Sequence, residues 1–355
     1  MLDKAAEWLK TIQPSEARIV YHGGCGDGLT SAAILSKFCQ KWFGEIPKSI
    51  AGSPNNLQKL KISSKYVIIV DIAADAWEKW TLNLAQNSKI LILDHHELLK
   101  NLNPFGILHV NPNIYSKDKL YYTGAKLVFD VCSKIYDVSD LDWLAAIGIV
   151  NDVAGEHWKD FLDSVFAKWS ELGSASYGFE SKIGFLASIL NSAQDVKNGE
   201  KIALRLLQKA ERPADILEGK SSEAKILLKI REARRAEMDY YVQNWKKIAI
   251  LHTKEKLVWL YIKPKYRIAS AVATILAQKN PDYLFIVLNE EDDRVKISFR
   301  QTKGLIDCNW LAQESTKLFG GAGGGHREAA GGTIKIIYLE QFKAKVLSLI
   351  KSKKI

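Results

Sequence analysis

The stretch KILILDHHE, residues 89–97, decides the predicted fold and points to the chemistry. Lys89 to Asp94 is predicted to form a buried parallel strand, because a short continuous apolar run is typical of strands covered on both faces. Asp94, His95 and His96 then stand at the carboxyl end of this strand, where open α/β sheets place their active sites. Asp and His together are ligands for divalent transition metals. A strand-end Asp-His pair satisfied by neighbouring backbone is the competing interpretation.

Further apolar segments on both sides of this stretch extend the pattern. Strands are predicted at 17–22, 66–73 and 106–112, and helices at 29–43, 76–86, 123–136, 141–155 and 181–194. Short apolar strands that alternate with helices predict the α/β class, with a doubly wound, mostly parallel sheet in the N-terminal lobe. We assign residues 1–195 to this domain.

The remainder of the chain is predicted to hold a helical connector at 196–247 and a smaller α+β lobe at 248–355. The helix predicted at 221–247 begins after Ser221 or Ser222, either of which could cap it. The second lobe is predicted to contain strands at 248–253, 257–262, 283–290, 294–301 and 331–339 and helices at 266–278 and 305–319.

Charge is distributed unevenly along the chain. Residues 196–355 carry 31 Lys and Arg against 18 Asp and Glu, a net of +13, whereas residues 1–195 carry 19 against 22, a net of −3. An acidic front half suits cation binding. A basic back half suits a polyanionic partner such as nucleic acid, although Lys-rich surfaces also serve solubility.

The cysteines and the hydropathy pattern indicate in which cellular compartment the protein is expected. The four cysteines, Cys25, Cys39, Cys132 and Cys308, form no CxxC pair, so a zinc knuckle is not expected, and their sparse use suits the reducing cytoplasm. No uncharged apolar stretch of 18 residues occurs, and the N-terminal segment lacks the order of a secretory signal, so we expect no membrane association.

Carboxylates and imidazoles follow several of the predicted strands. His22, Cys25 and Asp27 lie in or beside the Gly-rich turn after the first strand, Asp71 ends the second, and Asp94, His95 and His96 end the third, while Asp152 lies in GIVNDVAG, residues 148–155. Because these strand ends face one edge of a parallel sheet, we expect a site for two divalent cations that promote attack of water on phosphorus. Asp71, on a central strand, is the candidate bridging carboxylate. Asp27 as a turn residue and Asp152 as a surface acid remain alternatives.

A second motif is GGAGGGHREAAGG, residues 320–332. We predict a loop whose exposed amides form an anion nest, with His326 and Arg327 as donors to phosphate. Arg300 ends a neighbouring predicted strand and is a further candidate phosphate ligand, with an ordinary surface Arg as the alternative. The predicted substrate-binding residues are Arg300, Gly323, Gly324, Gly325, His326 and Arg327.

In order and spacing, these motifs resemble the DHH family of phosphoesterases with a DHH-associated C-terminal domain (RecJ-type and nanoRNase-like exonucleases). The resemblance covers nearly the whole chain, through HGGCGDGLTSAA, VIIVDIA, LILDHH, GIVNDVAG and GGAGGGHREAAGG. It implies a phosphoesterase with two divalent cations, usually manganese. One ion would be bound by His22 and Asp71 and the other by Asp27, Asp71, His95 and Asp152. His96 would contact the scissile phosphate, Asp94 would orient its neighbours, and Arg300 and His326 would hold the nucleotide.

One position departs from the family pattern. The first motif usually reads Asp-x-Asp-Gly, whereas here Cys25 occupies the place of the first acid. A thiolate is softer than a carboxylate and favours zinc over manganese or magnesium. Manganese therefore remains the expected ion, with magnesium, cobalt or zinc as alternatives set by whether Cys25 is a ligand.

The resemblance and the charge pattern together predict an exonuclease that releases nucleoside monophosphates. Its expected partners are single-stranded DNA or RNA, short oligonucleotides and a protein of a replication or DNA-repair complex. Two other functions stay open: a non-catalytic replication-associated scaffold of the same fold, and a hydrolase of cyclic dinucleotides or adenosine bisphosphate.

Overall fold

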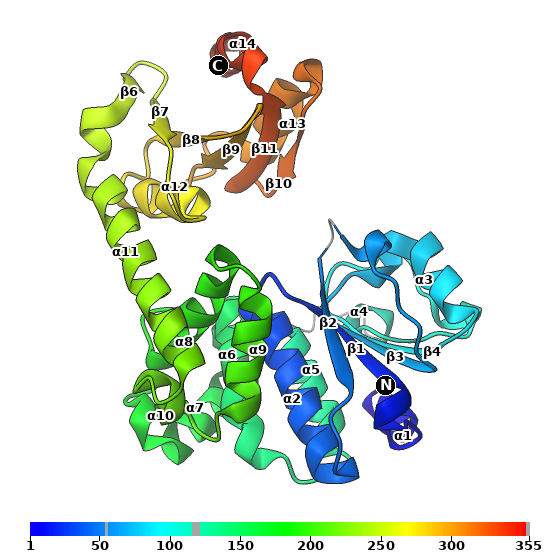
Figure 1. Cartoon of the computed structure of the whole chain (residues 1–355). Coiled ribbons are helices and arrows are strands. Elements are labelled where there is room, and N and C mark those ends of the chain that lie inside the picture. The colour runs from blue at the N-terminus through cyan, green and yellow to red at the C-terminus, as the bar shows by residue number, and fades with distance from the viewer. Residues whose placement is uncertain (54–55, 116–120, 353–355) are drawn as a thin grey trace. The chain divides into compact units, whose positions relative to one another are not determined.

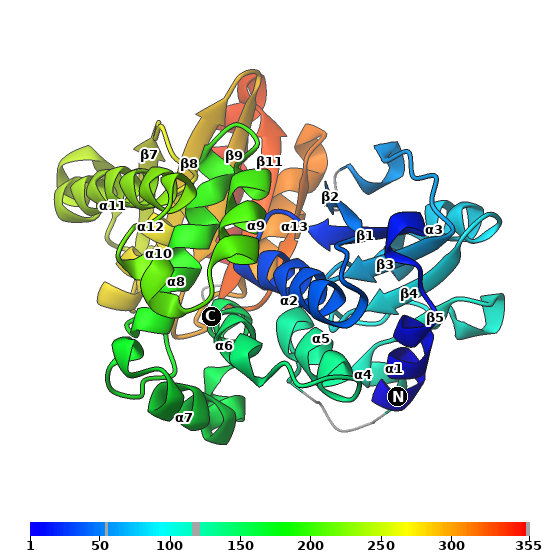
Figure 2. The ribbon, with the colours of Figure 1, turned by 60° about the horizontal axis from the view of Figure 1, so that its bottom comes forward.

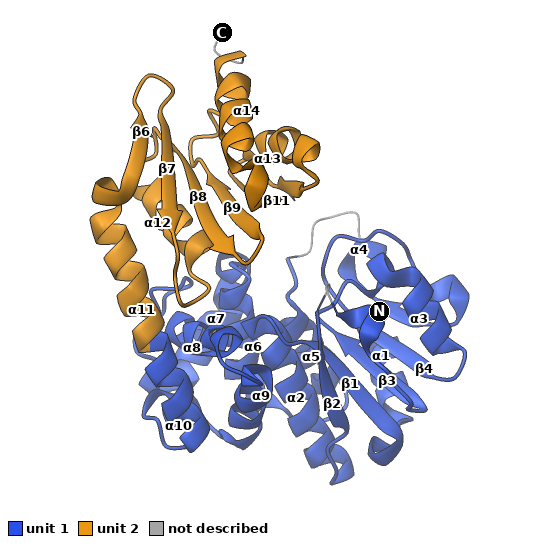
Figure 3. Ribbon diagram, turned by 45° about the horizontal axis from the view of Figure 1, so that its top comes forward, with its two compact units in different colours: residues 1–231 blue, residues 232–355 orange. Residues whose placement is uncertain are grey.

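The chain folds into two compact units. The computed structural model describes residues 1–53, 56–115 and 121–352, and the units are Met1–Arg231 and Glu232–Ile355 (Figure 3). Their boundary lies within the long helix α11 (Ser222–Ile248), so the predicted connector contributes residues to both units. The division into segments 1–195, 196–247 and 248–355 stays a prediction.

Unit 1 is built on a five-stranded parallel sheet with the strand order β2-β1-β3-β4-β5 (Figure 1). The strands are β1 (Ala17–His22), β2 (Lys48–Gly52), β3 (Tyr66–Val70), β4 (Lys89–Leu93) and β5 (Leu108–Val110). Helices cover both faces, as a doubly wound sheet requires, and the predicted α/β fold is confirmed. The middle strand is β3, all five residues of which are buried.

The part of this sheet that the sequence pattern missed is its edge. Strand β2 has the sequence KSIAG and lies at the edge beside β1. Lys48 is exposed, and the Ala and Gly residues of this strand are poor strand formers. Its register with β1 in the tertiary structure, not its composition, makes this segment a strand.

Alternate side chains of the strands enter two separate cores. Ile68, Val70 and Leu91 pack against the layer that contains α2 and α5, whereas Val67 and Ile69 pack against the layer that contains α3. Figure 2 shows α2 and α5 side by side along one face of the sheet. The helices of unit 1 before α11 are α1 (Leu2–Lys10), α2 (Gly26–Phe43), α3 (Glu78–Ala85), α4 (Pro112–Tyr115), α5 (Gly124–Ser133), α6 (Asp142–Asn151), α7 (Lys159–Lys168), α8 (Lys182–Asn191), α9 (Gly199–Lys209) and α10 (Pro213–Leu217). Within the described residues, none of the helices combines the length and apolar character needed to cross a membrane.

Unit 2 is a smaller α+β structure with a mixed six-stranded sheet in the order β10-β11-β9-β8-β7-β6. Its α+β class is the one predicted from the sequence. Helix α12 packs on one face, and α13 and α14 pack on the other. The elements are β6 (Ala249–His252), β7 (Leu257–Ile262), α12 (Ala269–Lys279), β8 (Leu284–Glu291), β9 (Arg294–Arg300), α13 (Cys308–Thr316), β10 (Ala322–Gly325), β11 (Ala329–Lys335) and α14 (Leu339–Ser352).

The Gly-rich segment of unit 2 is a β-hairpin, and the prediction of a loop with an exposed row of amides is wrong in this respect. Strands β10 and β11 pair antiparallel from Ala322↔Thr333 to Gly325↔Ala330, so several of these amides belong to the sheet. A Cβ at position 323 would lie 2.5 Å from the carbonyl oxygen of Ala312. Glycine at this position therefore allows a strand to run directly against α13.

Helix α11 gives a stability test. The Ser221 hydroxyl accepts a hydrogen bond from the amide of Ala224 at 3.1 Å, whereas the Ser222 hydroxyl donates to the Glu223 carboxylate at 3.0 Å. Ser221 is therefore the cap. We expect Ser221→Ala to lower the free energy of unfolding by about 1 kcal/mol and Ser222→Ala to lower it less, as measured by urea denaturation. Equal losses in the two variants would contradict the assignment.

Candidate metal centre

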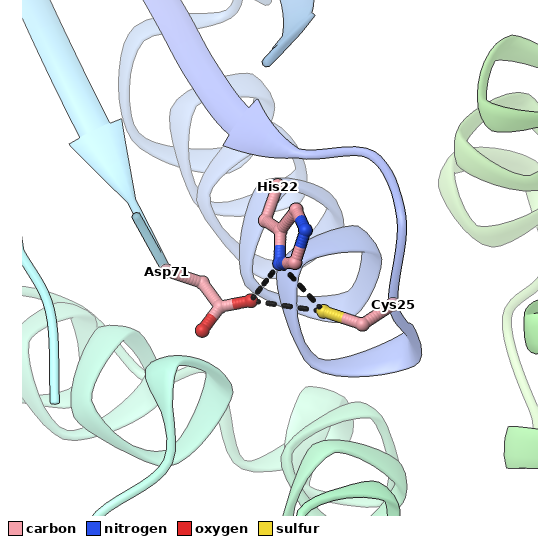
Figure 4. Close-up of side chains that lie close together, drawn as sticks. All are labelled: His22, Cys25 and Asp71. Carbon is pink, nitrogen blue, oxygen red and sulfur yellow. Dashed lines mark hydrogen bonds and ion pairs between the residues drawn. The ribbon is translucent and has the colours of Figure 1, made fainter. Parts of the chain in front are cut away.

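Three potential ligand atoms meet where β1 and β3 end and α2 begins. His22 is the last residue of β1, Cys25 is the residue before α2, and Asp71 follows β3. Cys25 Sγ lies 3.2 Å from His22 Nδ1 and 3.0 Å from Asp71 Oδ2, and the latter two atoms lie 3.5 Å apart. Figure 4 shows the three side chains pointing toward one another. We call this set the first ligand group.

A second ligand group surrounds the ring of His95, just beyond β4. His95 Nε2 lies 3.1 Å from Asp71 Oδ1, 3.3 Å from Asp152 Oδ2 and 3.6 Å from Asp27 Oδ2. The three carboxylates come from the end of β3, the end of α6 and the first turn of α2. The structure thus brings Asp152 into the cluster, although sequence alone allowed a surface acid.

Asp71 belongs to both groups, with one carboxylate oxygen in each. Its φ of 55° lies in the left-handed region, which a residue with a side chain adopts only at a cost. Its amide still donates to the carbonyl of Leu93, so pairing with β4 continues through the turn. The backbone turn at the end of the central strand therefore places this carboxylate between the two groups.

The first turn of α2 was predicted to lie in a loop, and that prediction is wrong. Gly26 and Asp27 are already helical, because Cys25 Sγ accepts the amide of Gly28 and caps the helix. A Cβ at position 28 would lie 2.2 Å from the carbonyl oxygen of His22, so glycine allows α2 to begin directly against β1.

Asp27 is fully buried and fixed by a second helix. Its carboxylate accepts hydrogen bonds from the amides of Gly124 at 2.6 Å and Ala125 at 2.8 Å, the first two residues of α5. Amides at a helix N-terminus favour a negative charge. Gly148 of α6 leaves room for this carboxylate, because a Cβ there would lie 2.3 Å from Asp27 Oδ1.

The two groups concentrate negative charge in a buried place. Burial, with the charges of Asp71 and Asp152, raises the pKa of Asp27, and burial with the charge of Asp71 raises the pKa of Asp152. Burial also opposes ionisation of Asp71, but hydrogen bonds with His22 and His95 outweigh it and hold its pKa well below the usual range.

The neighbouring acids also change the pKa values of the His95 imidazole and the Cys25 thiol. Burial alone would lower the pKa of His95, but the hydrogen bond with Asp71 and the charge of Asp27 raise it to about 10. Burial raises the pKa of the Cys25 thiol, and the charges of Asp71 and Asp27 raise it further. The carboxylates of the cluster outnumber the protonated imidazoles that could offset their charge. The cluster is therefore suited to binding divalent metal cations.

The separations also fit divalent ions. Ligands held about 2.1 Å from an ion at right angles to each other are about 3.0 Å apart, and those of a tetrahedral ion about 3.5 Å. The atoms of each group lie within 4.8 Å of one another, and the separations measured from Cys25 Sγ and from His95 Nε2 span 3.0–3.6 Å. The donors could therefore hold a metal ion in each group.

His96 lies beside the second ligand group, because a ring nitrogen of His96 lies within 4.8 Å of ligand atoms of both Asp71 and His95. Its Nδ1 lies 2.7 Å from Asp94 Oδ1, and this hydrogen bond raises the pKa of His96. Asp94 is buried, whereas the His96 side chain is 43% exposed. The side-chain amides of Asn111 and Asn113 donate to the His96 carbonyl, which fixes the segment after β4.

A chain of side-chain amides that the sequence analysis missed joins the helices of the cluster. The amide of Gly26 donates to Asn191 Oδ1 at 3.1 Å, Asn191 Nδ2 donates to Asn151 Oδ1 at 2.8 Å, and Asn151 Nδ2 donates to Asp152 Oδ1 at 3.1 Å. Asn151 precedes a predicted ligand and could have been noticed. Asn191, at the end of α8, has no local signal in the sequence.

The predicted substrate-binding residues all lie in unit 2. His326 and Arg327 are exposed in the turn of the β10–β11 hairpin, where the His326 amide donates to the carbonyl of Ala329. Of the five N–H groups of the Arg300 guanidinium, four donate to Thr274, Ser270 and the carbonyls of Phe299 and Ala330. Arg300 thereby joins β9, β11 and α12, and within the described part of the chain one donor is left for a ligand.

Comparison with known proteins supports the motif resemblance. Residues 255–352 match the DHHA1 domain family. Over 99% of its length the chain resembles the structure of RecJ from Thermus thermophilus in complex with Mn2+, at 19% identity and a TM-score of 0.76. The chain has the DHH fold with a C-terminal DHHA1 domain. The family resemblance predicted from the motifs is confirmed.

The coverage of the similar structures differs. This DHH-fold chain spans 55% of the Thermus RecJ chain but 94% of a second exonuclease RecJ bound to manganese, which matches 99% of this chain at 20% identity and a TM-score of 0.75. It also spans 99% of the pGpG-specific phosphodiesterase PggH from Vibrio cholerae, which matches 95% of this chain at 14% identity and a TM-score of 0.52. A search of curated protein sequences finds no match.

The amide chain leads to a test of metal affinity. Asn191→Ala removes the link between α2 and Asn151, so Asp27 and Asp152 lose a common support. We expect affinity for Mn2+ to fall about tenfold, as is typical when groups that orient metal ligands are removed. Isothermal titration calorimetry measures it, with Asn83→Ala on the exposed side of α3 as the control. Unchanged affinity in Asn191→Ala would contradict this role.

Proposed function

We propose that this chain is a metal-dependent phosphodiesterase that hydrolyses single-stranded nucleic acid or short oligonucleotides from one end and releases nucleoside monophosphates. The observation that carries the proposal is the shared carboxylate of Asp71, with one oxygen in each of two ligand groups. A carboxylate that serves two adjacent ions is the feature that two-metal hydrolysis of phosphate esters requires.

In this proposal, His22, Cys25 and Asp71 hold one divalent cation, and Asp27, Asp71, His95 and Asp152 hold the other. When bound, such cations lower the pKa of a water molecule and offset the charge of the phosphate. The buried helix N-terminus of α5 fixes Asp27 before any ion binds, so this ligand needs little rearrangement.

His96 is proposed to contact the scissile phosphate. Its hydrogen bond to Asp94 occupies Nδ1 and raises the pKa of the ring, which favours the form that carries a proton on Nε2. The exposed part of the ring can then donate from Nε2 to a phosphate oxygen. Asp94 acts through His96 and is a positioning residue.

Unit 2 is proposed to bind the nucleotide. Its basic composition supports a substrate with several phosphates, since residues 232–355 carry 22 Lys and Arg against 13 Asp and Glu, a net charge of +9. His326 and Arg327 lie exposed at the hairpin turn beside Gly323, Gly324 and Gly325 and offer donors to phosphate. Arg300 is proposed to keep the hairpin in place and to offer its remaining N–H.

A second candidate is hydrolysis of a small dinucleotide or adenosine bisphosphate. The fold similarity to PggH, described as specific for pGpG, favours this function over hydrolysis of other small phosphate esters. The ligand groups would be the same in both functions. The difference would lie in whether unit 2 holds one short substrate or the end of a longer strand.

The catalytic proposal has a direct test. Asp71→Asn and His95→Ala are each expected to reduce Mn2+-dependent hydrolysis of a labelled oligonucleotide by at least about a thousandfold, because each removes ligands that two-metal chemistry needs. Glu97→Gln, which changes the exposed acid beside the same motif, should keep the wild-type rate. Wild-type turnover in Asp71→Asn would exclude this site, and absence of hydrolysis in the wild type would support the non-catalytic scaffold.

A substrate panel tests the choice of substrate. DNA and RNA single strands labelled at either end are compared with pGpG and adenosine bisphosphate. We expect the oligonucleotides to be preferred and their cleavage to weaken steeply with added salt, because several phosphates are contacted. A preference for pGpG with little salt dependence would instead support the dinucleotide hydrolase.

A further inference from the structure

We infer that the two metal positions of this chain are chemically unequal: the first ligand group selects a thiophilic ion such as zinc or cobalt, and the second binds manganese or magnesium. The inference rests on the proposed metal-dependent function and names which ion each group takes. It depends on Cys25, which stands where the resemblance predicts a carboxylate.

The donor sets of the two groups differ. The first offers one thiol, one imidazole and one carboxylate oxygen, from Cys25, His22 and Asp71, whereas the second offers three carboxylates and one imidazole. Sulfur and nitrogen donors suit zinc and cobalt, and oxygen donors suit manganese and magnesium. Because Asp71 is shared, the remaining ligands make the distinction.

The sulfur atom is placed as a ligand. Sγ of Cys25 lies 3.0 Å from Asp71 Oδ2 and 3.2 Å from His22 Nδ1, and all three atoms face a common point (Figure 4). Zinc ligands lie about 2.0–2.3 Å from the ion, which gives ligand separations of about 3.5 Å in a tetrahedral site. Small movements would bring this triangle to that size.

The N-terminus of α2 holds the sulfur in position. The amide of Gly28 donates to Sγ at 3.3 Å, and Cys25 precedes a helix of 18 residues. This contact fixes where the sulfur atom lies relative to His22 and Asp71. The same contact supplies the competing interpretation, in which Cys25 only caps α2 and its thiol donates to Asp71.

Serine separates the two interpretations. A Ser hydroxyl is a better helix cap than a thiol, so Cys25→Ser should keep α2 and the fold while removing the soft ligand. Cys25→Asp restores the residue type of the family pattern. Cys308, which is buried in the core of unit 2, gives the control variant Cys308→Ser.

The first measurement is the absorption spectrum of the protein loaded with Co2+. We expect a sulfur-to-cobalt charge-transfer band in the wild type and in Cys308→Ser, and its loss in Cys25→Ser with the melting temperature unchanged. A wild-type protein that binds cobalt without this band overturns the inference, and so does a band that survives in Cys25→Ser.

The second measurement is competition between ions. Protein with one equivalent of Zn2+ and an excess of Mn2+ is dialysed, its metals are counted, and bound manganese is followed by electron paramagnetic resonance. The wild type should retain about one zinc and one manganese, whereas Cys25→Asp should lose zinc preference by at least about tenfold. Equal zinc retention in both proteins overturns the inference.

These readouts do not depend on turnover. A charge-transfer band without hydrolysis of any phosphodiester would leave the unequal metal positions intact and reject the proposed function. Hydrolysis without the charge-transfer band would support the proposed function and reject the unequal metal positions.

Discussion

Buried negative charge at one edge of the unit 1 sheet is the constraint on which this structure depends. Asp27, Asp71 and Asp152 all approach the ring of His95, and the charge of Asp71 makes ionisation of Asp27 and of Asp152 less favourable. Buried like charges at such distances require compensation by cations or by donors. His95 and the amides of α5 supply part of it, and divalent cations are suited to supply the rest.

The scaffold keeps this costly arrangement through local features of the backbone. Asp71 occupies a left-handed conformation immediately after the most buried strand, and its amide remains paired with β4. Gly28 and Gly148 lie where any side chain would collide with a cluster residue or its backbone. Rigid packing of this kind reduces the rearrangement that metal binding would otherwise require.

Unit 2 uses its polar groups differently. Most donors of Arg300 are committed to neighbouring elements, so this side chain contributes to the architecture of the sheet as well as to the proposed substrate site. Gly323 and Gly332 of the hairpin allow close packing against α13. His326 and Arg327 are exposed at its turn, where the Arg327 guanidinium also donates to the carbonyl of Gly304.

The sequence by itself determined the parallel sheet, because the apolar runs at 66–70 and 89–93 are too continuous for a half-exposed strand. It also located His22, Asp71 and His95, since residues that follow parallel strands share one edge. Tertiary structure alone decided the edge strand β2, the amide chain through Asn191 and the pairing of the Gly-rich hairpin. Each of these depends on partners distant in sequence, such as the bond between Gly26 and Asn191, and a local pattern carries no record of such partners.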